Sequence, residues 1–377
     1  MATPDILDFE TLLAPIPGDN PAGADIREDA SPASNYYKLK DARSAARAAE
    51  RSVTSEEESS GLAEEWGTII DLAPKVLREQ TKDLEVAAWL TEALVRAGGF
   101  PGLRDGFKLI LGLVEGFWDN LYPLEDEDGL ETKVGPVSGL NGEGAEGTLI
   151  QPIRKVPLTD GSAGSFAAWH YKIASDVAQI ADDERRQKRI DAGAPTVDKI
   201  LDSVRDTPTE FFVDLVDDLK EAADTFQKMN DAFYERCGDM SPPYSYIRGE
   251  LETVSELVQF LGRDKLAMAA PAAEPEAEEA AADGAAPAAG GGAAAGTAVR
   301  GAVGDIVTRD DAFRQLLKIA EFFRKNEPHS PIAYTLEEVV RRGRLPLAEL
   351  LRELVPDVDA RQRFLLASGI RPPTDEE

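Results

Sequence analysis

The stretch KDLEVAAWLTEALVRAGGFPGLRDGFKLILGLVEGFWDNLYP, residues 82–123, decides the fold of this chain. Apolar residues recur at helical spacing from Leu84 to Val95 and again from Leu103 to Phe117, as expected for helices that each bury one face. Between the two patterns, Gly98-Gly99 can supply the left-handed residue that ends a helix. The stretch therefore predicts two helices that pack against each other as a hairpin.

The second of these patterns ends in an aromatic segment, FWDNLYP at residues 117–123. Trp118 and Tyr122 are four residues apart and would share one face of a helix. Pro123 lacks the amide proton that a continuing helix needs. We therefore expect a structural aromatic plug where the chain turns, and not a platform for a ligand.

Several short motifs in the first part of the chain carry a resemblance to a known family. They are Pro15-Ile16, the loop Gly18-Asp19-Asn20-Pro21-Ala22-Gly23, Trp66, Lys82-Asp83-Leu84, Trp89-Leu90, Gly102-Leu103, Phe117-Trp118-Asp119 and Tyr122-Pro123. In this order they resemble the ImpA-related amino-terminal domain of the TssA family, whose members are components of the bacterial type VI secretion system. The resemblance covers about the first 160 residues, and we expect the motif residues to be structural. One departure is Lys133, where the family pattern leads us to expect an arginine with its bidentate geometry.

The composition favours a mainly α fold with several domains. The chain has 377 residues, which is long enough for two or three domains. Alanine and leucine are frequent, and aromatic residues make up only 7%, so helices packed on helices are expected. We expect an ImpA-related helical domain at 1–160, a middle helical bundle at 161–268, a disordered linker at 269–304 and a small helical oligomerisation module at 305–377.

Helical periodicity marks the middle bundle. The expected helices cover residues 166–190, a segment after Thr196, residues 208–233 and residues 247–261. The connection Thr148–Thr159 is expected to be extended and to form at most a short edge strand, because Pro152 and Pro157 cannot donate backbone hydrogen bonds to a sheet. The later linker consists mostly of Ala, Gly, Pro and Glu, so burial would not offset the entropy lost on ordering it. It is therefore predicted to be a flexible tether.

The tail module has explicit helix signals. Thr308 with Asp311 resembles a capping box, Ser330-Pro331 resembles an N-cap and first helical residue, and Pro346 would start a further helix. The residues from Phe322-Phe323-Arg324 to Glu327-Pro328-His329-Ser330-Pro331 resemble the short carboxy-terminal module of one TssA subgroup. Its apolar faces exceed what so small a bundle can bury, so we expect it to self-associate. The candidate oligomerisation or partner-binding residues are Phe313, Leu317, Phe323, Glu327, Pro328, His329, Leu336 and Leu351.

Charge and cysteine content restrict the partners and the compartment. The formal net charge is −29, which would repel a nucleic-acid backbone before contact. The segment Met1–Leu13 has no basic or apolar signal region, and no later apolar run approaches the ~20 residues that a membrane span needs. Cys237 is the only cysteine, so an internal disulfide is excluded. We expect a cytoplasmic protein whose Cys237 is a small packing residue.

The motifs that invite chemistry do not form a recognisable site. Gly142–Gly147 matches G-x-G-x-x-G, but its glutamates and the following Pro152 favour an acidic loop over a nucleotide site. The acidic loop Leu124–Gly129 resembles part of a calcium loop, but Leu124 and Gly135 occupy the first and twelfth positions, where carboxylates are needed. His170 and His329 are the only histidines and are expected to be structural, so no zinc site or Ser-His-Asp assembly is predicted. We expect no catalytic, cofactor or metal site.

The resemblance implies a non-enzymatic assembly protein of the type VI secretion system. Members of the family form rings and dock on the baseplate, the sheath or the inner tube of the contractile apparatus, and contact the membrane only indirectly, through the membrane complex. The short tail favours the baseplate first and distal-end capping second. The alternative from another class is a cytosolic enzyme with an unrecognised carboxylate-based site.

Overall fold

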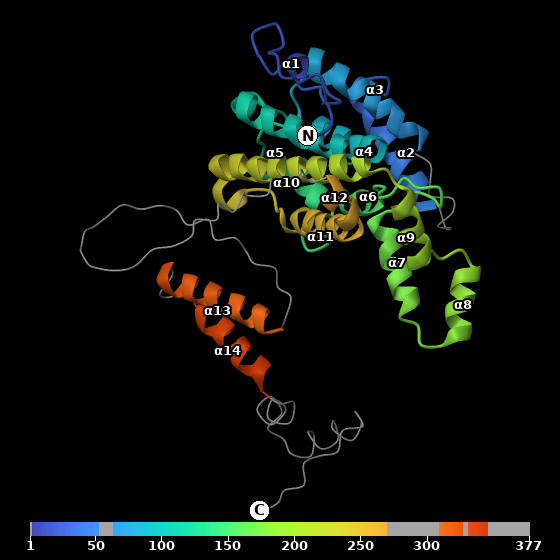
Figure 1. Cartoon of the computed structure of the whole chain (residues 1–377). Coiled ribbons are helices and arrows are strands. Elements are labelled where there is room, and N and C mark those ends of the chain that lie inside the picture. The colour runs from blue at the N-terminus through green and yellow to red at the C-terminus, as the bar shows by residue number, and fades with distance from the viewer. Residues whose placement is uncertain (1, 53–62, 270–308, 327–330, 346–377) are drawn as a thin grey trace, which may run out of the picture. The chain divides into compact units, whose positions relative to one another are not determined.

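The computed structural model describes residues 2–52, 63–269, 309–326 and 331–345, and their regular elements are helices (Figure 1). The prediction of a mainly α chain is confirmed. None of the described helices is both long and apolar enough to cross a membrane. The chain divides into two compact units, Met1–Ala277 and Glu278–Glu377, which are described separately below.

The first unit is built from twelve α-helices and two short 3-10 turns among its described residues. In chain order these are α1 (Phe9–Leu12), α2 (Asn35–Ser52), α3 (Glu64–Glu79), α4 (Leu84–Phe117), η2 (Trp118–Asn120), α5 (Leu130–Asn141), α6 (Ile150–Lys155), α7 (Ala168–Ala178), α8 (Asp183–Asp191), α9 (Val197–Asp206), α10 (Thr209–Cys237), η3 (Gly238–Met240), α11 (Ser245–Leu261) and α12 (Arg263–Ala269).

The predicted hairpin is present within α4, which breaks at Gly99. Gly99 has φ 62° and ψ −139°, a conformation that side chains other than hydrogen rarely allow. The two halves then pack with their backbones close together. A Cβ atom on Gly102 would lie 2.1 Å from the carbonyl oxygen of Leu94, and one on Gly106 would lie 2.5 Å from Cγ2 of Thr91. Glycine is therefore required where the two halves cross.

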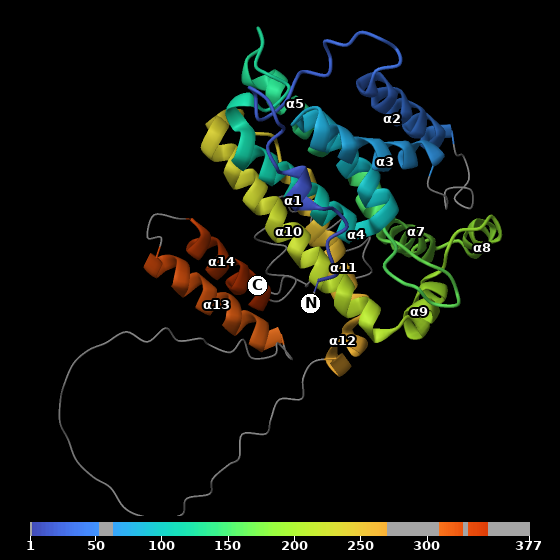
Figure 2. The ribbon, with the colours of Figure 1, turned by 90° about the horizontal axis from the view of Figure 1, so that it is seen from above.

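Helix α10 lies alongside α4 and joins the later helices to the hairpin (Figure 1 and Figure 2). The rings of Phe107 and Phe226 pack with their centroids 4.9 Å apart. A buried ion network reinforces this contact, since Arg104 on α4 donates to Asp218 on α10 at 2.8 Å and to the neighbouring Asp105 at 2.9 Å. One hydrophobic core runs continuously from Leu12 to Leu261 through these helices.

Two sequence expectations about this unit are wrong. Residues 148–159 were expected to be extended, but α6 forms within them. Pro152 is the third residue of α6, in the first turn, where an amide has no partner within the helix. Residues 166–190 were expected to form one helix, but the helix stops after α7 and Asp182 caps a separate α8 by accepting from the amide of Arg185 at 2.7 Å.

The helices predicted after Thr196, from Pro208 and at residues 247–261 are confirmed as α9, α10 and α11. The hydroxyl of Thr196 caps α9 by accepting from the amide of Lys199. Phe166, Ala174 and Ile200 form a small second core where α7 meets α9.

The described part of the second unit is a pair of helices, α13 (Arg309–Asn326) and α14 (Ile332–Arg344). They pack antiparallel, because a Cβ atom on Gly343 would lie 2.6 Å from Cζ of Phe313 near one end, while Arg324 pairs with Glu337 toward the other. The predicted caps Thr308 and Ser330, the helix expected at Pro346, and the 269–304 linker beyond Ala269 lie outside the described residues.

Candidate functional site

The Lys82-Asp83-Leu84 motif lies where the two ends of the hairpin meet. Lys82 is fully buried, and its ammonium donates to the carbonyl oxygens of Leu12 at 2.6 Å and Leu77 at 2.9 Å. Its Nζ also lies 5.4 Å from the centre of the Phe117 ring. Burial lowers the pKa of Lys82 to about 8. Lys82 therefore ties α1 and the end of α3 to the end of the hairpin.

The neighbouring Asp83 is the N-cap of α4. Its carboxylate accepts from the amides of Glu85 at 2.8 Å and Val86 at 3.1 Å, which satisfies two amides of the first helical turn. The guanidinium of Arg27 lies 2.6 Å from Asp83 and 2.7 Å from Glu85. Burial alone would lower the pKa of Arg27, but these two carboxylates raise it above its ordinary value.

Backbone hydrogen bonds bring the separate family motifs together. The amide of Leu84 donates to the carbonyl of Tyr122 at 2.7 Å, and the amide of Tyr122 donates to Lys82 at 3.0 Å. Lys82 in turn donates to Ala22 at 2.7 Å, and the side chain of Asn20 reaches the Tyr122 hydroxyl at 3.3 Å. The motifs at 18–23, 82–84 and 117–123 therefore form one structural joint.

Trp118 lies beside this joint and is only partly buried. Its ring meets that of Phe233 edge to face at 6.1 Å between centroids. Lys133 is buried, and its Nζ lies 4.9 Å from the Trp118 ring centre. Burial lowers the pKa of Lys133. Lys133, the residue that departs from the family pattern, thus places its ammonium over the Trp118 ring. Through Trp118, α5 is linked to Phe233 on α10.

A groove of about 690 Å³ opens between α2, the first half of α4 and α5. Its lining residues are Asp25, Arg27, Tyr36, Arg43, Glu85, Ala88, Trp89, Glu92, Pro123, Leu124, Glu125, Asp126, Thr132, Gly135, Pro136 and Gly139. Trp89 and Tyr36 lie with their ring centroids 5.7 Å apart, and Arg43 pairs with buried Glu92 at 2.6 Å. Sequence reasoning missed this groove, since helices that are distant in sequence build it.

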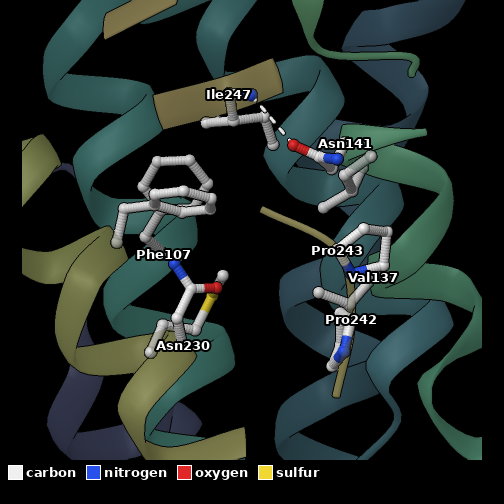
Figure 3. A pocket seen from close by; sticks show the side chains of 10 residues that line it. Phe107, Val137, Asn141, Asn230, Pro242, Pro243 and Ile247 are labelled. Carbon is white, nitrogen blue, oxygen red and sulfur yellow. Dashed lines mark hydrogen bonds between the residues drawn. The ribbon is translucent and has the colours of Figure 1, made fainter. Parts of the chain in front are cut away.

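A second hollow is lined by side chains from α4, α5, α10 and α11 and from the segment before α11 (Figure 3). It leaves no space for a water molecule. Asn141 accepts a hydrogen bond there from the amide of Ile247 at 2.9 Å, whereas the buried amide nitrogen of Asn230 has no hydrogen-bond partner among the described residues. This hollow belongs to the core and has no room for a ligand.

The motifs that could have carried chemistry have local structural contacts. Gly142–Gly147 is a turn between α5 and α6, where the amide of Gly147 donates to the carbonyl of Asn141. Asp126 accepts from the amide of Asp128 in its own loop and from the hydroxyl of Thr132 in the first turn of α5. Nδ1 of His170 accepts from the amide of Ala167 at the start of α7. Cys237 is half-buried, and burial raises its pKa.

The candidate oligomerisation residues lie partly within α13 and α14. Phe313, Phe323 and Leu336 are half-buried, and Leu317 is 36% exposed. Glu327, Pro328, His329 and Leu351 lie outside the described residues. Larger exposed apolar side chains were not selected from the sequence, because periodicity alone does not say which face stays uncovered. They include Phe322 at 60% and Tyr334 at 64% exposed.

Known proteins match this chain in three ways. Residues 13–142 match the family described as ImpA, N-terminal, type VI secretion system. The chain is 29% identical over 357 residues to the type VI secretion system component TssA1 of Pseudomonas aeruginosa, covering 93% of this chain and 96% of that protein.

The structure also matches the solved N-terminal domain, including the conserved ImpA_N region, of the TssA component of the type VI secretion system from Burkholderia cenocepacia. The TM-score is 0.58 and the sequence identity 32%, and the match covers 68% of this chain and 94% of that one. Agreement in both sequence and structure across nearly all of that domain shows that this chain belongs to the TssA family of type VI secretion system components.

Proposed function

We propose that this protein is a non-enzymatic assembly component of the type VI secretion system. In this proposal it forms a ring-like oligomer through its second unit and docks on the baseplate or the sheath and tube, where it promotes their assembly. The observation that carries the proposal is the similarity to TssA1, which extends over 93% of the chain and so includes both units.

The arrangement of ionisable side chains supports a structural role. Buried charges in the first unit hold helices together: Arg104 joins α4 to α10, and Lys82 donates to two backbone carbonyls. The buried carboxylate of Glu92 accepts from Arg43 and from the hydroxyl of Thr148 at 2.7 Å. A carboxylate held in this way is a poor general acid or base, so the groove does not favour the alternative of an enzyme.

The apolar surface of the second unit supports self-association. Phe322 and Tyr334 are mostly exposed, and Ile319 and Val339 are 44% and 49% exposed. Large apolar side chains at such density on a helix pair are typical of an interface. A ring of identical copies would cover them and would multiply weak contacts with a repetitive partner.

We further propose that the protein acts in the cytoplasm, with the baseplate as its first partner and the distal end of the sheath as its second. Contact with the membrane would be indirect, through the membrane complex. The net charge of −29 disfavours nucleic acid as a partner.

The test is a pulldown with the purified full chain against purified baseplate, sheath and tube proteins from the same organism. We expect at least one of them to be retained, and we expect a screen of small-molecule substrates to find no turnover. Retention of none of these proteins, or turnover that copurifies with the chain, would contradict the proposal.

A further inference from the structure

Two glycines in the wall of the groove have no role in the fold of this unit. Gly135 and Gly139 are exposed, lie within α5 and are not among the glycines with positive φ. A Cβ atom on either would meet nothing within 4 Å. Glycine inside a helix is destabilising relative to alanine, and here neither internal packing nor backbone conformation requires it.

These glycines differ from those of the hairpin. Gly102 and Gly106 are explained by close neighbours within the chain. Gly67, Gly116 and Gly249 are also open, but each occurs singly and none lines the groove. Gly135 and Gly139 are one helical turn apart and both line it, so the backbone of α5 is bare along one side of the groove. A second polypeptide could approach α5 closely there.

The charge of the groove indicates what could approach. Its lining holds five carboxylates, from Asp25, Glu85, Glu92, Glu125 and Asp126, against two guanidiniums. Both guanidiniums are already paired with carboxylates, Arg27 with Asp83 and Glu85, and Arg43 with Glu92. Glu125 forms no ion pair or hydrogen bond with another described residue, although its charge interacts at longer range with the ammonium of Lys133. A surplus of negative charge therefore faces the groove.

The groove also offers apolar surface and enough room for several residues. Leu124 at its rim is 46% exposed, and Pro123 and Pro136 lie beside it. The volume of about 690 Å³ is within the range that ordered ligands fill. A segment with both apolar and basic side chains could pack against Leu124 and form ion pairs with the carboxylates at the same time.

We propose that this groove docks a basic segment of a partner protein. The backbone of that segment lies against Gly135 and Gly139, and a lysine or arginine side chain pairs with Glu125. This inference rests on the proposed function in one respect, namely that the chain acts by binding proteins of the secretion apparatus.

The first experiment places the photo-crosslinking residue p-benzoylphenylalanine at Leu124, a large apolar rim residue, in the full chain, with the same residue at Gly116 as the control. Each protein is irradiated with purified baseplate, sheath and tube proteins, and cross-linked peptides are identified by mass spectrometry. We expect the residue at position 124, and not the one at position 116, to cross-link to a segment of one of these proteins that contains lysine or arginine and has a net positive charge.

The second experiment measures the affinity of that partner for groove variants. Gly135→Leu combined with Gly139→Leu should weaken binding at least tenfold, because the new side chains hold the partner away from α5. The same variant should melt no lower than wild type, since leucine is a good helix former and its Cβ meets no neighbour. Glu125→Lys should also weaken binding, with an effect that shrinks as salt is added. Gly116→Leu should bind like wild type.

Four results would overturn the inference: cross-linking at position 124 no stronger than at position 116, cross-links to a second copy of this chain, cross-links to an acidic or uncharged segment, or unchanged affinity of the double leucine variant. If the pulldown still retains apparatus proteins, the proposed function stands and only the groove assignment fails. If the wild-type chain retains none of them, the proposed function fails as well.

Discussion

Lys82 is a cation that the fold keeps fully buried without a carboxylate partner among the described residues. Two backbone carbonyls and the Phe117 ring solvate it in place of water. Its neighbour Asp83 is equally buried but is matched by Arg27 and by the amides of α4. The motif therefore contains a buried charge that destabilises the fold, Lys82, and a buried charge that is paired, Asp83. Both side chains hold together the segments that meet at the joint.

Because burial of the charged Lys82 ammonium destabilises the folded chain, the free energy of unfolding should depend on pH. The pKa of Lys82 is about 8 in the folded chain, against an ordinary value of 10.5 that applies to the unfolded chain. Between these two pH values the side chain is therefore protonated in the unfolded chain and neutral in the folded chain. Stability should therefore rise with pH in this window, by about 3 kcal/mol in all. Urea denaturation at pH 7 to 10.5 should show this rise for wild type relative to Lys82→Met.

Exposed Lys75 supplies the control, since Lys75→Met should follow the wild-type pH profile. If the difference in unfolding free energy between wild type and Lys82→Met is the same at pH 7 and pH 10.5, burial does not depress the pKa of Lys82.

Trp118→Ala should lower the free energy of unfolding by about 3 kcal/mol, near the lower end of the cost for a buried tryptophan. The ring is partly exposed, but its loss removes the contact with Phe233 and leaves the buried ammonium of Lys133 without its aromatic neighbour. Urea denaturation measures the change. A variant that melts within a degree or two of wild type yet loses a partner protein would make Trp118 an interface residue.

At the scale of elements, periodicity predicted the helices whose apolar face is long and uninterrupted. The hairpin of α4 and the helices α10 and α11 were identified from the sequence in this way. Sequence reasoning failed at α6, because Pro152 was taken as evidence against a helix, although the first turn of a helix tolerates proline. It failed again at residues 179–182, where apolar spacing continues but Asp182 starts a new helix.

The joint and the groove differ in how far sequence could reveal them. The motif residues of the joint were identified from the sequence, but their convergence depends on backbone bonds such as that between Leu84 and Tyr122. The groove depends on how α2, the first half of α4 and α5 are placed in the tertiary structure, which no local pattern encodes. Gly135 and Gly139 were the sequence feature that could have indicated the groove, because glycine is unfavourable inside an exposed helix.

The crossing of the two halves of α4 gives a prediction with a matched control on the same helix. Gly106→Ala should destabilise the protein by about 1–3 kcal/mol, because the added Cβ would lie 2.5 Å from Cγ2 of Thr91. Gly116→Ala should instead stabilise it by about 0.5–1 kcal/mol, because Gly116 is exposed and its Cβ would meet nothing. Thermal denaturation of the two variants measures both effects. Equal effects of the same sign would contradict the packing described at Gly106.

At the scale of the whole molecule, the two units have different surfaces. The first has a continuous core that includes most of its large apolar side chains, with buried charges that are hydrogen-bonded, although Tyr234 and Phe260 are exposed. The described helices of the second unit leave Phe322 and Tyr334 largely exposed. In the proposed function, the first unit docks partner proteins and the exposed apolar side chains of the second unit mediate self-association.

Self-association through the second unit is the central claim, and the molar mass of the full chain tests it most directly. Light scattering with negative-stain images should give a ring whose mass is a multiple of the 40.7 kDa chain. Phe322→Glu combined with Tyr334→Glu should reduce it to a monomer or dimer, whereas Tyr234→Glu should keep the ring, because Tyr234 is as exposed as Tyr334 but lies on α10 of the first unit. A monomeric wild-type chain, or a double variant that retains the full mass, would contradict this account.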